Sequence, residues 1–169
     1  MMSSHDWTRR RWLGVALAGQ AGWAALPARA AGPADVIDWP TLVDIDGRTV
    51  AAASWRGIPA VVVFWATDCA YCRRHNAHVD RLFRSVDPHR LRVVGVVMAA
   101  DAVAARHYMT AQSYRFPVMA DNGHLRARFT QRRVIPMTCT VGADGRLLQS
   151  IPGEMAEDDV LGLARGAKA

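Results

Sequence analysis

The feature that most constrains the fold is a continuous apolar run at residues 60–65, which ends shortly before two closely spaced cysteines. The run is Ala-Val-Val-Val-Phe-Trp, and an uninterrupted β-branched and aromatic segment of this length predicts a central strand buried on both faces. From Cys72 to Val86 apolar residues recur at helical spacing between charged ones, which predicts an amphipathic helix. A buried strand therefore leads Cys69 to the amino terminus of a helix.

The rest of the chain alternates strand and helix patterns without an internal repeat. Residues 42–45 and 48–50 flank Asp46-Gly47, a dipeptide that adopts positive φ readily, so they predict a hairpin. Residues 92–98 predict a second buried strand. The remaining expected elements are a helix capped by Asp101, a short strand at 116–119, a short helix at 124–129, a hairpin pairing 137–141 with 147–151, and a last helix opening at 157–159. This order predicts one α/β domain with a mixed sheet flanked by helices.

The first thirty residues have the pattern of an export signal. A basic block at residues 8–11 precedes an apolar stretch at 13–26 that is short for a membrane span, and Ala-Arg-Ala at 28–30 is a small-x-small cleavage pattern. We expect residues 1–30 to be a signal peptide and residues 31–169 to form a single periplasmic domain. The Thr-Arg-Arg-x-Trp-Leu order resembles a twin-arginine signal, and an ordinary secretory signal is the alternative.

Charge and cysteine content narrow the classes of partner. The formal charge is +6 at pH 7, and half of this excess lies in residues 1–30. The other basic residues are dispersed rather than clustered with aromatic ones, so no nucleic-acid partner is expected. Export places the chain where disulfides persist, and its three cysteines allow at most one internal pair.

The two-residue spacing of Cys69 and Cys72 suits thiol chemistry. At a helix amino terminus the free amide hydrogens and the helix dipole stabilise a thiolate at the first position. We therefore expect Cys69 to attack a partner disulfide and Cys72 to resolve the mixed disulfide that forms. No cofactor is needed for this exchange.

A metal site is the alternative use of such a pair. No second Cys-x-x-Cys exists to complete a zinc site. Cys69, Cys72, His75 and His78 follow one another at steps of three, but each step turns a helical side chain by about 60°, so the four cannot converge on one ion. No metal site is expected, the alternative being a subset of these residues completed by outside ligands.

Residues 64–74, Phe-Trp-Ala-Thr-Asp-Cys-Ala-Tyr-Cys-Arg-Arg, resemble the active-site segment of the TlpA/ResA branch of the thioredoxin superfamily. The similarity extends to the entry hairpin at 42–56 and to Val-Ile-Pro-Met-Thr at 134–138. It implies a thioredoxin-like fold with an N-terminal β-hairpin extension. It also implies a thiol:disulfide oxidoreductase that exchanges disulfides with protein thiols and is served by a membrane or periplasmic redox partner. Some members of the branch serve cytochrome c maturation or copper-centre assembly.

The resemblance also implies the substrate-binding segment. In the branch the proline opposite the cysteines is cis, and the matching bond here is Ile135-Pro136, whereas an isolated Ile-Pro bond is ordinarily trans. The backbone of Ile135, Pro136 and Met137 is expected to pair with the substrate chain. Trp65 is expected to lie in the core or line the site.

Three positions depart from the family pattern. Asp68 replaces the usual tryptophan before the first cysteine, and its charge is expected to oppose thiolate formation on Cys69. Val63 stands where thioredoxin has a buried acid, and His75 stands where the branch often has a glutamate. We expect His75 to take the proton-transfer role, the alternative being a solvated helix residue. Cys139 is expected to be a small buried thiol.

The expected function is that of a periplasmic thiol:disulfide oxidoreductase acting as a reductant. A disulfide oxidase or isomerase is one alternative, since Cys-x-Tyr-Cys is similar to the motif of bacterial disulfide isomerases. A thioredoxin-fold Cu(I)-delivery protein is another, because soft thiolates favour that ion. A peroxidase fits less well, because the Pro-x-x-x-Thr-x-x-Cys pattern of peroxiredoxins is absent around Cys69.

Overall fold

A central mixed sheet organises the computed structural model, which describes residues 36–98, 102–121 and 124–166. Its strand order is β5-β4-β3-β6-β7. The strands are β3 (Ala60–Trp65), β4 (Arg92–Val97), β5 (Val118–Ala120), β6 (Met137–Val141) and β7 (Leu147–Pro152). The β3-β4 and β4-β5 pairs are parallel, and the β3-β6 and β6-β7 pairs are antiparallel. The expected mixed sheet is therefore confirmed, while the expected signal peptide lies outside the described residues.

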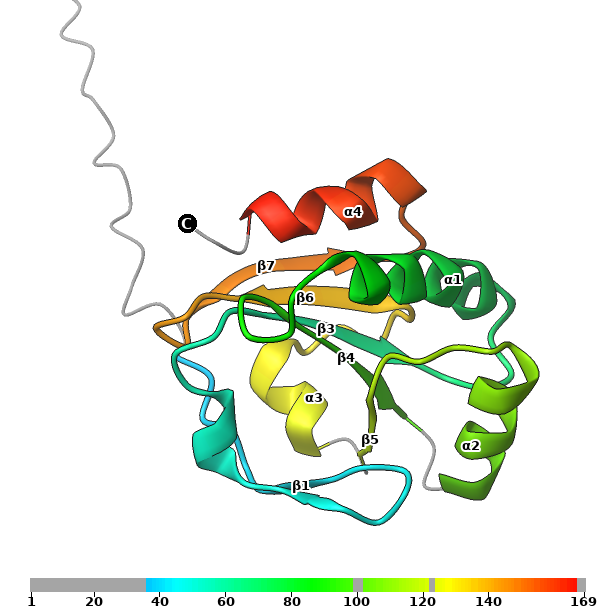
Figure 1. Ribbon diagram of the computed structural model, residues 1–169, viewed down its shortest axis with the longest axis horizontal. Coiled ribbons are helices and arrows are strands. Elements are labelled where there is room, and N and C mark those ends of the chain that lie inside the picture. Colours follow the sequence, from blue (N-terminus) through cyan, green and yellow to red (C-terminus); the bar gives the residue numbers. More distant parts are fainter. Residues whose placement is uncertain (1–35, 99–101, 122–123, 167–169) are drawn as a thin grey trace, which may run out of the picture. The chain divides into compact units, whose positions relative to one another are not determined.

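Helices cover both faces of the sheet (Figure 1). Helices α1 (Ala70–Ser85) and α4 (Glu157–Gly166) lie on one face, and α3 (His124–Phe129) lies on the other. Helix α2 (Ala102–Ala111) adds Ala105 and Met109 to the core beneath α1. Because successive strand residues point to opposite faces, β3 sends Val61, Val63 and Trp65 into that core and sends Val62 and Phe64 into the core beneath α3.

The predicted amino-terminal hairpin is present but shorter than expected. Strands β1 (Leu42–Val43) and β2 (Thr49–Val50) pair antiparallel, and Gly47 takes a φ of 83° in the turn. The Asp44 carboxylate closes the turn by accepting the backbone N–H groups of Asp46 and Arg48 at 2.9 and 2.8 Å. A 3-10 helix at Ala52–Trp55, which the sequence pattern did not predict, follows the hairpin.

Among the element boundaries that differ from expectation, two have a clear local reason. Helix α1 begins at Ala70, since Cys69 is its N-cap. Strand β5 begins at Val118, because Pro117 has no backbone N–H to contribute to the ladder. The expected cap Asp101 lies outside the described residues. No helix in the described part of the chain is long and apolar enough to cross a membrane.

Candidate active site

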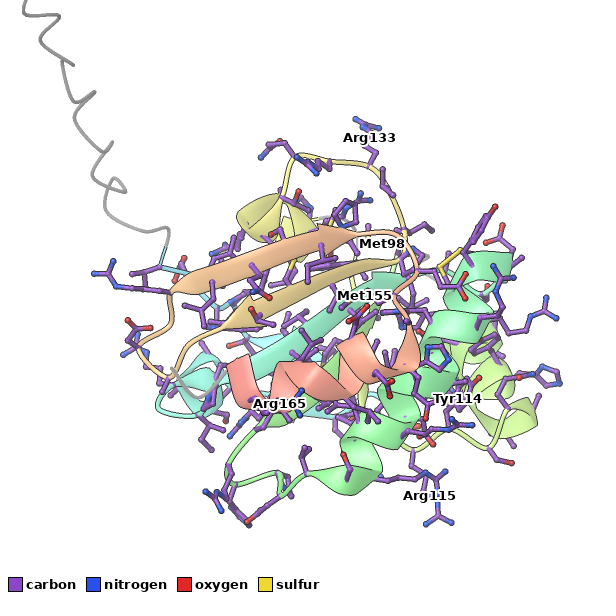
Figure 2. All side chains as sticks on the ribbon, turned by 90° about the horizontal axis from the view of Figure 1, so that it is seen from above. Met98, Tyr114, Arg115, Arg133, Met155 and Arg165 are labelled. Atoms are coloured by element: carbon purple, nitrogen blue, oxygen red, sulfur yellow. A yellow bond between two sulfur atoms is a disulfide. The ribbon has the colours of Figure 1, made fainter. Side chains whose placement is uncertain are left out.

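Cys69 and Cys72 form a disulfide at the start of α1, with their Cα atoms 5.2 Å apart (Figure 2). The backbone N–H of Cys72 donates to Cys69 Sγ at 3.1 Å, so the first cysteine sits in the capping position of the helix. Cys72 is completely buried, whereas Cys69 is half-buried. Cys69 is therefore the sulfur that an incoming protein can reach, and amide hydrogens are directed at it.

The segment before β6 enters the sheet next to β3, the strand that precedes the cysteine pair. Strand β6 pairs with β3 so that Met137 is opposite Phe64, close to where β3 leads toward Cys69. The Ile135-Pro136 peptide bond is cis, as the resemblance implies. The Pro136 carbonyl accepts the backbone N–H of Gly153 at 2.8 Å. The expected substrate-binding segment thus leads into the strand next to β3, and its role in binding stays a prediction.

His75 is buried, so the alternative of a solvated helix residue is wrong. Its Nε2 lies 2.9 Å from Thr138 Oγ1, and the backbone N–H of Met155 donates to Nδ1 at 3.3 Å. Since Nδ1 is the acceptor, Nε2 carries the hydrogen atom and donates a hydrogen bond to Thr138 Oγ1. Burial, reinforced by the neighbouring His78, lowers the pKa of His75 to about 4. The ring is therefore neutral near pH 7 with both nitrogens engaged, and its role in proton transfer stays a prediction.

The segment between β7 and α4 contacts the first turns of α1 (Figure 2). Glu154 accepts three hydrogen bonds from Arg74, the shortest from Nη2 to Oε2 at 2.6 Å, and this pairing lowers the pKa of the carboxyl group. The Arg74 guanidinium also lies 5.0 Å from the centroid of the exposed Tyr71 ring. His78 Nδ1 lies 3.2 Å from the Met155 carbonyl. No sequence pattern pointed to Glu154 or Met155, because about 80 residues separate them from α1.

Asp68 is exposed directly before Cys69. Arg74, six residues later in the chain, is paired with Glu154. Among the described residues Asp68 forms no ion pair. Its negative charge is thus held beside Cys69 without a paired cation, and its effect on the thiolate stays a prediction.

Trp65 is completely buried beneath α1 rather than exposed at the rim of the site. Its ring contacts Tyr108 of α2, with the ring centroids 4.9 Å apart. A Cβ atom on Gly95 would lie only 2.7 Å from Trp65 Nε1, so the indole needs a glycine at that position of β4. Trp65 therefore belongs to the supporting layer under the cysteines.

Among the described residues, neither a metal-ligand cluster nor the third cysteine contributes to the site. In the described ranges no three His, Cys, Asp or Glu side chains are grouped so as to hold a metal ion. Cys139 is a free, buried thiol, as expected, and lies in the core on the opposite sheet face from Cys72. Burial raises the pKa of Cys139 to about 11, which keeps it protonated.

Comparisons with known proteins agree on one superfamily. The model of the AhpC/TSA family matches residues 34–148. The thiol-disulfide oxidoreductase ResA of Bacillus thuringiensis is 18% identical over 119 residues, which are 70% of this chain and 69% of that protein. A thioredoxin-family thiol:disulfide interchange protein from Chlorobium tepidum superposes with a TM-score of 0.68 at 23% identity, over 75% of this chain and 91% of its own. A secreted Mycobacterium tuberculosis disulfide oxidoreductase homologous to E. coli DsbE gives 0.66 at 22% identity, over 75% and 94%.

Proposed function

Since the chain belongs to the AhpC/TSA family and is a thiol:disulfide oxidoreductase of the TlpA/ResA branch of the thioredoxin superfamily, we propose that it reduces protein disulfides in the periplasm. The observation that carries this proposal is the asymmetry of the cysteine pair. Cys69 is half-buried at a helix N-cap, and Cys72 is completely buried one turn later. The periplasmic location rests on the expected signal peptide at residues 1–30.

The proposed reaction passes two electrons to the client protein. The Cys69 thiolate attacks one sulfur of the client disulfide, and the other client sulfur leaves as a thiolate and takes up a proton. Cys72 then loses its proton and attacks Cys69 Sγ. The second client thiol is released and the Cys69–Cys72 disulfide closes. A membrane or periplasmic redox partner must return the two electrons before the next cycle.

The neighbouring residues have distinct roles in this proposal. The backbone at Ile135, Pro136 and Met137 holds the client chain next to Cys69. Asp68 opposes the thiolate and thereby tunes the redox equilibrium. His75 holds α1 against β6 through its hydrogen bond to Thr138. For His75 to take part in proton transfer, the hydrogen bond from the Met155 backbone N–H to its Nδ1 must break. Cytochrome c maturation is the expected setting for the clients.

Trapping of mixed disulfides tests the assignment of the two cysteines. In Cys72→Ser the first attack still occurs but resolution fails, so client proteins should accumulate as disulfide adducts on non-reducing gels. Cys69→Ser should form none. Cys139→Ser, made in the Cys72→Ser background, is the control and should leave the adducts unchanged, because that thiol is buried on the other face of the sheet. Adducts formed by Cys69→Ser alone would reverse the assignment.

A further inference from the structure

A cluster of buried polar groups without hydrogen-bond partners lies beneath α1. Within the described part of the chain, Trp65 Nε1, both amide atoms of Asn76 and the Tyr108 hydroxyl have no partner. Asn76 and Trp65 are completely buried. Buried polar groups in folded proteins are almost always bonded to protein or to ordered water. Four such atoms in one place therefore indicate a ligand that can both donate and accept hydrogen bonds.

The three side chains come from three elements and are linked through Tyr108. The rings of Trp65 in β3 and Tyr108 in α2 are in contact. The Asn76 amide from α1 interacts weakly with the Tyr108 hydroxyl. This contact lowers the pKa of Tyr108 against the larger, raising effect of burial, but its geometry falls short of a hydrogen bond. The Trp65 N–H lies over Gly95, where any side chain would displace it.

The cluster adjoins Cys72. A helix turns by about 100° per residue, so Asn76 lies about 40° to one side of Cys72 and His75 about 60° to the other. Asn76 is also one turn along the helix from Cys72, the spacing at which side chains are neighbours. Val63, at the position of thioredoxin's buried acid, pairs with Gly95 on this side and with Thr138 on the His75 side. The chain therefore has no acid at that position to exchange a proton with Cys72.

We propose that Asn76, Tyr108 and Trp65 bind internal water beside Cys72, and that this water carries the proton of Cys72 during disulfide exchange. The proposal rests on the resolving role of Cys72 stated above. The Cys72 thiol passes its proton through the water to solvent, its thiolate attacks Cys69 Sγ, and the client sulfur leaves and takes up a proton from solvent. Reduction of the disulfide runs the same transfer in reverse.

The chemistry of the cluster fits water. An internal water needs two to four polar partners. The Trp65 N–H and the Asn76 amide N–H groups donate to it, the Asn76 carbonyl accepts from it, and the Tyr108 hydroxyl does either. Asn76 and Trp65 do not titrate, and burial raises the pKa of Tyr108, so all three stay neutral. The proton is therefore carried by the water and not by a charged side chain.

Two substitutions of Asn76 separate this role from simple packing. Asn76→Leu keeps the volume and removes both polar anchors, whereas Asn76→Ser loses volume and keeps a hydroxyl that binds water. Positioned proton transfer accelerates a step by roughly 10²- to 10⁴-fold, so even partial loss in Asn76→Leu should slow release of the client from the mixed disulfide by about tenfold or more. Asn76→Ser should restore most of that rate although it is the less stable variant. Tyr108→Phe should slow release as well.

The measurement is single-turnover reduction of a disulfide-bonded peptide, with attack by Cys69 and release through Cys72 followed separately. Attack should be unchanged in all variants. Tyr114→Phe is the matched control, because that hydroxyl donates to the Arg73 carbonyl outside the cluster. The proposal is overturned if release follows stability, with Asn76→Leu faster than Asn76→Ser, or if no variant slows release. Failure of Cys72→Ser to trap adducts would instead remove the proposed function itself.

Discussion

The two flanks of Cys72 differ in how their buried polar groups are bonded. On the His75 flank, made of His75, Thr138 and Met155, the imidazole uses both of its nitrogens. On the Asn76 flank, made of Asn76, Tyr108 and Trp65, the polar side-chain atoms have no partner among the described residues. The flanks lie on either side of one buried sulfur. A network in which every polar group is bonded holds the helix in place. Polar groups without protein partners can instead bind water, and this water can move a proton.

The largest expected effect is a loss of folding stability in acid, and it comes from the His75 flank. The pKa of His75 is about 4 in the folded protein and near 6.5 in the unfolded chain. The fold therefore favours the neutral ring, so this contribution to stability is complete above pH 6.5 and is lost as the pH falls toward 4. The loss is about 3 kcal/mol, since each pKa unit corresponds to about 1.4 kcal/mol.

Urea unfolding at pH 7.5 and pH 4 measures this contribution. His75→Gln should flatten the difference between the two conditions, and His89→Gln, at an exposed histidine, should not. If His75→Gln loses as much stability at pH 4 as the unaltered protein, the ring is not held neutral by burial.

Deletion of one hydroxyl on each flank sharpens the comparison. Thr138→Val removes the acceptor of the His75 Nε2–H and leaves a buried donor unpaired, which should lower the free energy of unfolding by about 1–3 kcal/mol. Tyr108→Phe removes a hydroxyl that has no direct protein partner, so it should cost less than about 1 kcal/mol. Chemical denaturation of both variants at pH 7.5 gives the two values. Equal costs, or a larger one for Tyr108→Phe, would contradict the difference between the flanks.

Asp68 should give the smallest effect, because it is exposed and outside both flanks. Removing its charge in Asp68→Asn should stabilise the Cys69 thiolate and so raise the reduction potential, by no more than about 30 mV if the coupling is worth one pKa unit. Asp46→Asn, at an exposed acid in the hairpin turn, is the control. Glutathione redox equilibration that gives the same potential for Asp68→Asn and the unaltered protein would show that this position does not tune the site.

Local sequence patterns predicted the strand and the helix that carry the cysteines. The surroundings of the cysteines depend on contacts between residues far apart in the sequence, which local patterns do not predict. The apolar run at 60–65 predicted β3 with its observed limits, and the expected hairpin of 137–141 with 147–151 predicted β6 with its observed limits. The partners of His75 could not be predicted, since Thr138 and Met155 lie 63 and 80 residues away. One signal was available: His75 and Asn76 lie three and four residues after Cys72, on the same helical stripe as the buried Val79 and Leu82. That spacing indicates burial for both side chains.

The reduction potential of the Cys69–Cys72 pair tests the central claim most directly, because it fixes the direction in which electrons flow. Equilibration of the protein with glutathione buffers, read out by alkylation of the free thiols, gives the value. A potential near that of thioredoxin, about −270 mV, is the expected result for a reductant of protein disulfides. A potential near about −120 mV, typical of a strong oxidant, would contradict the proposed function and favour a disulfide oxidase.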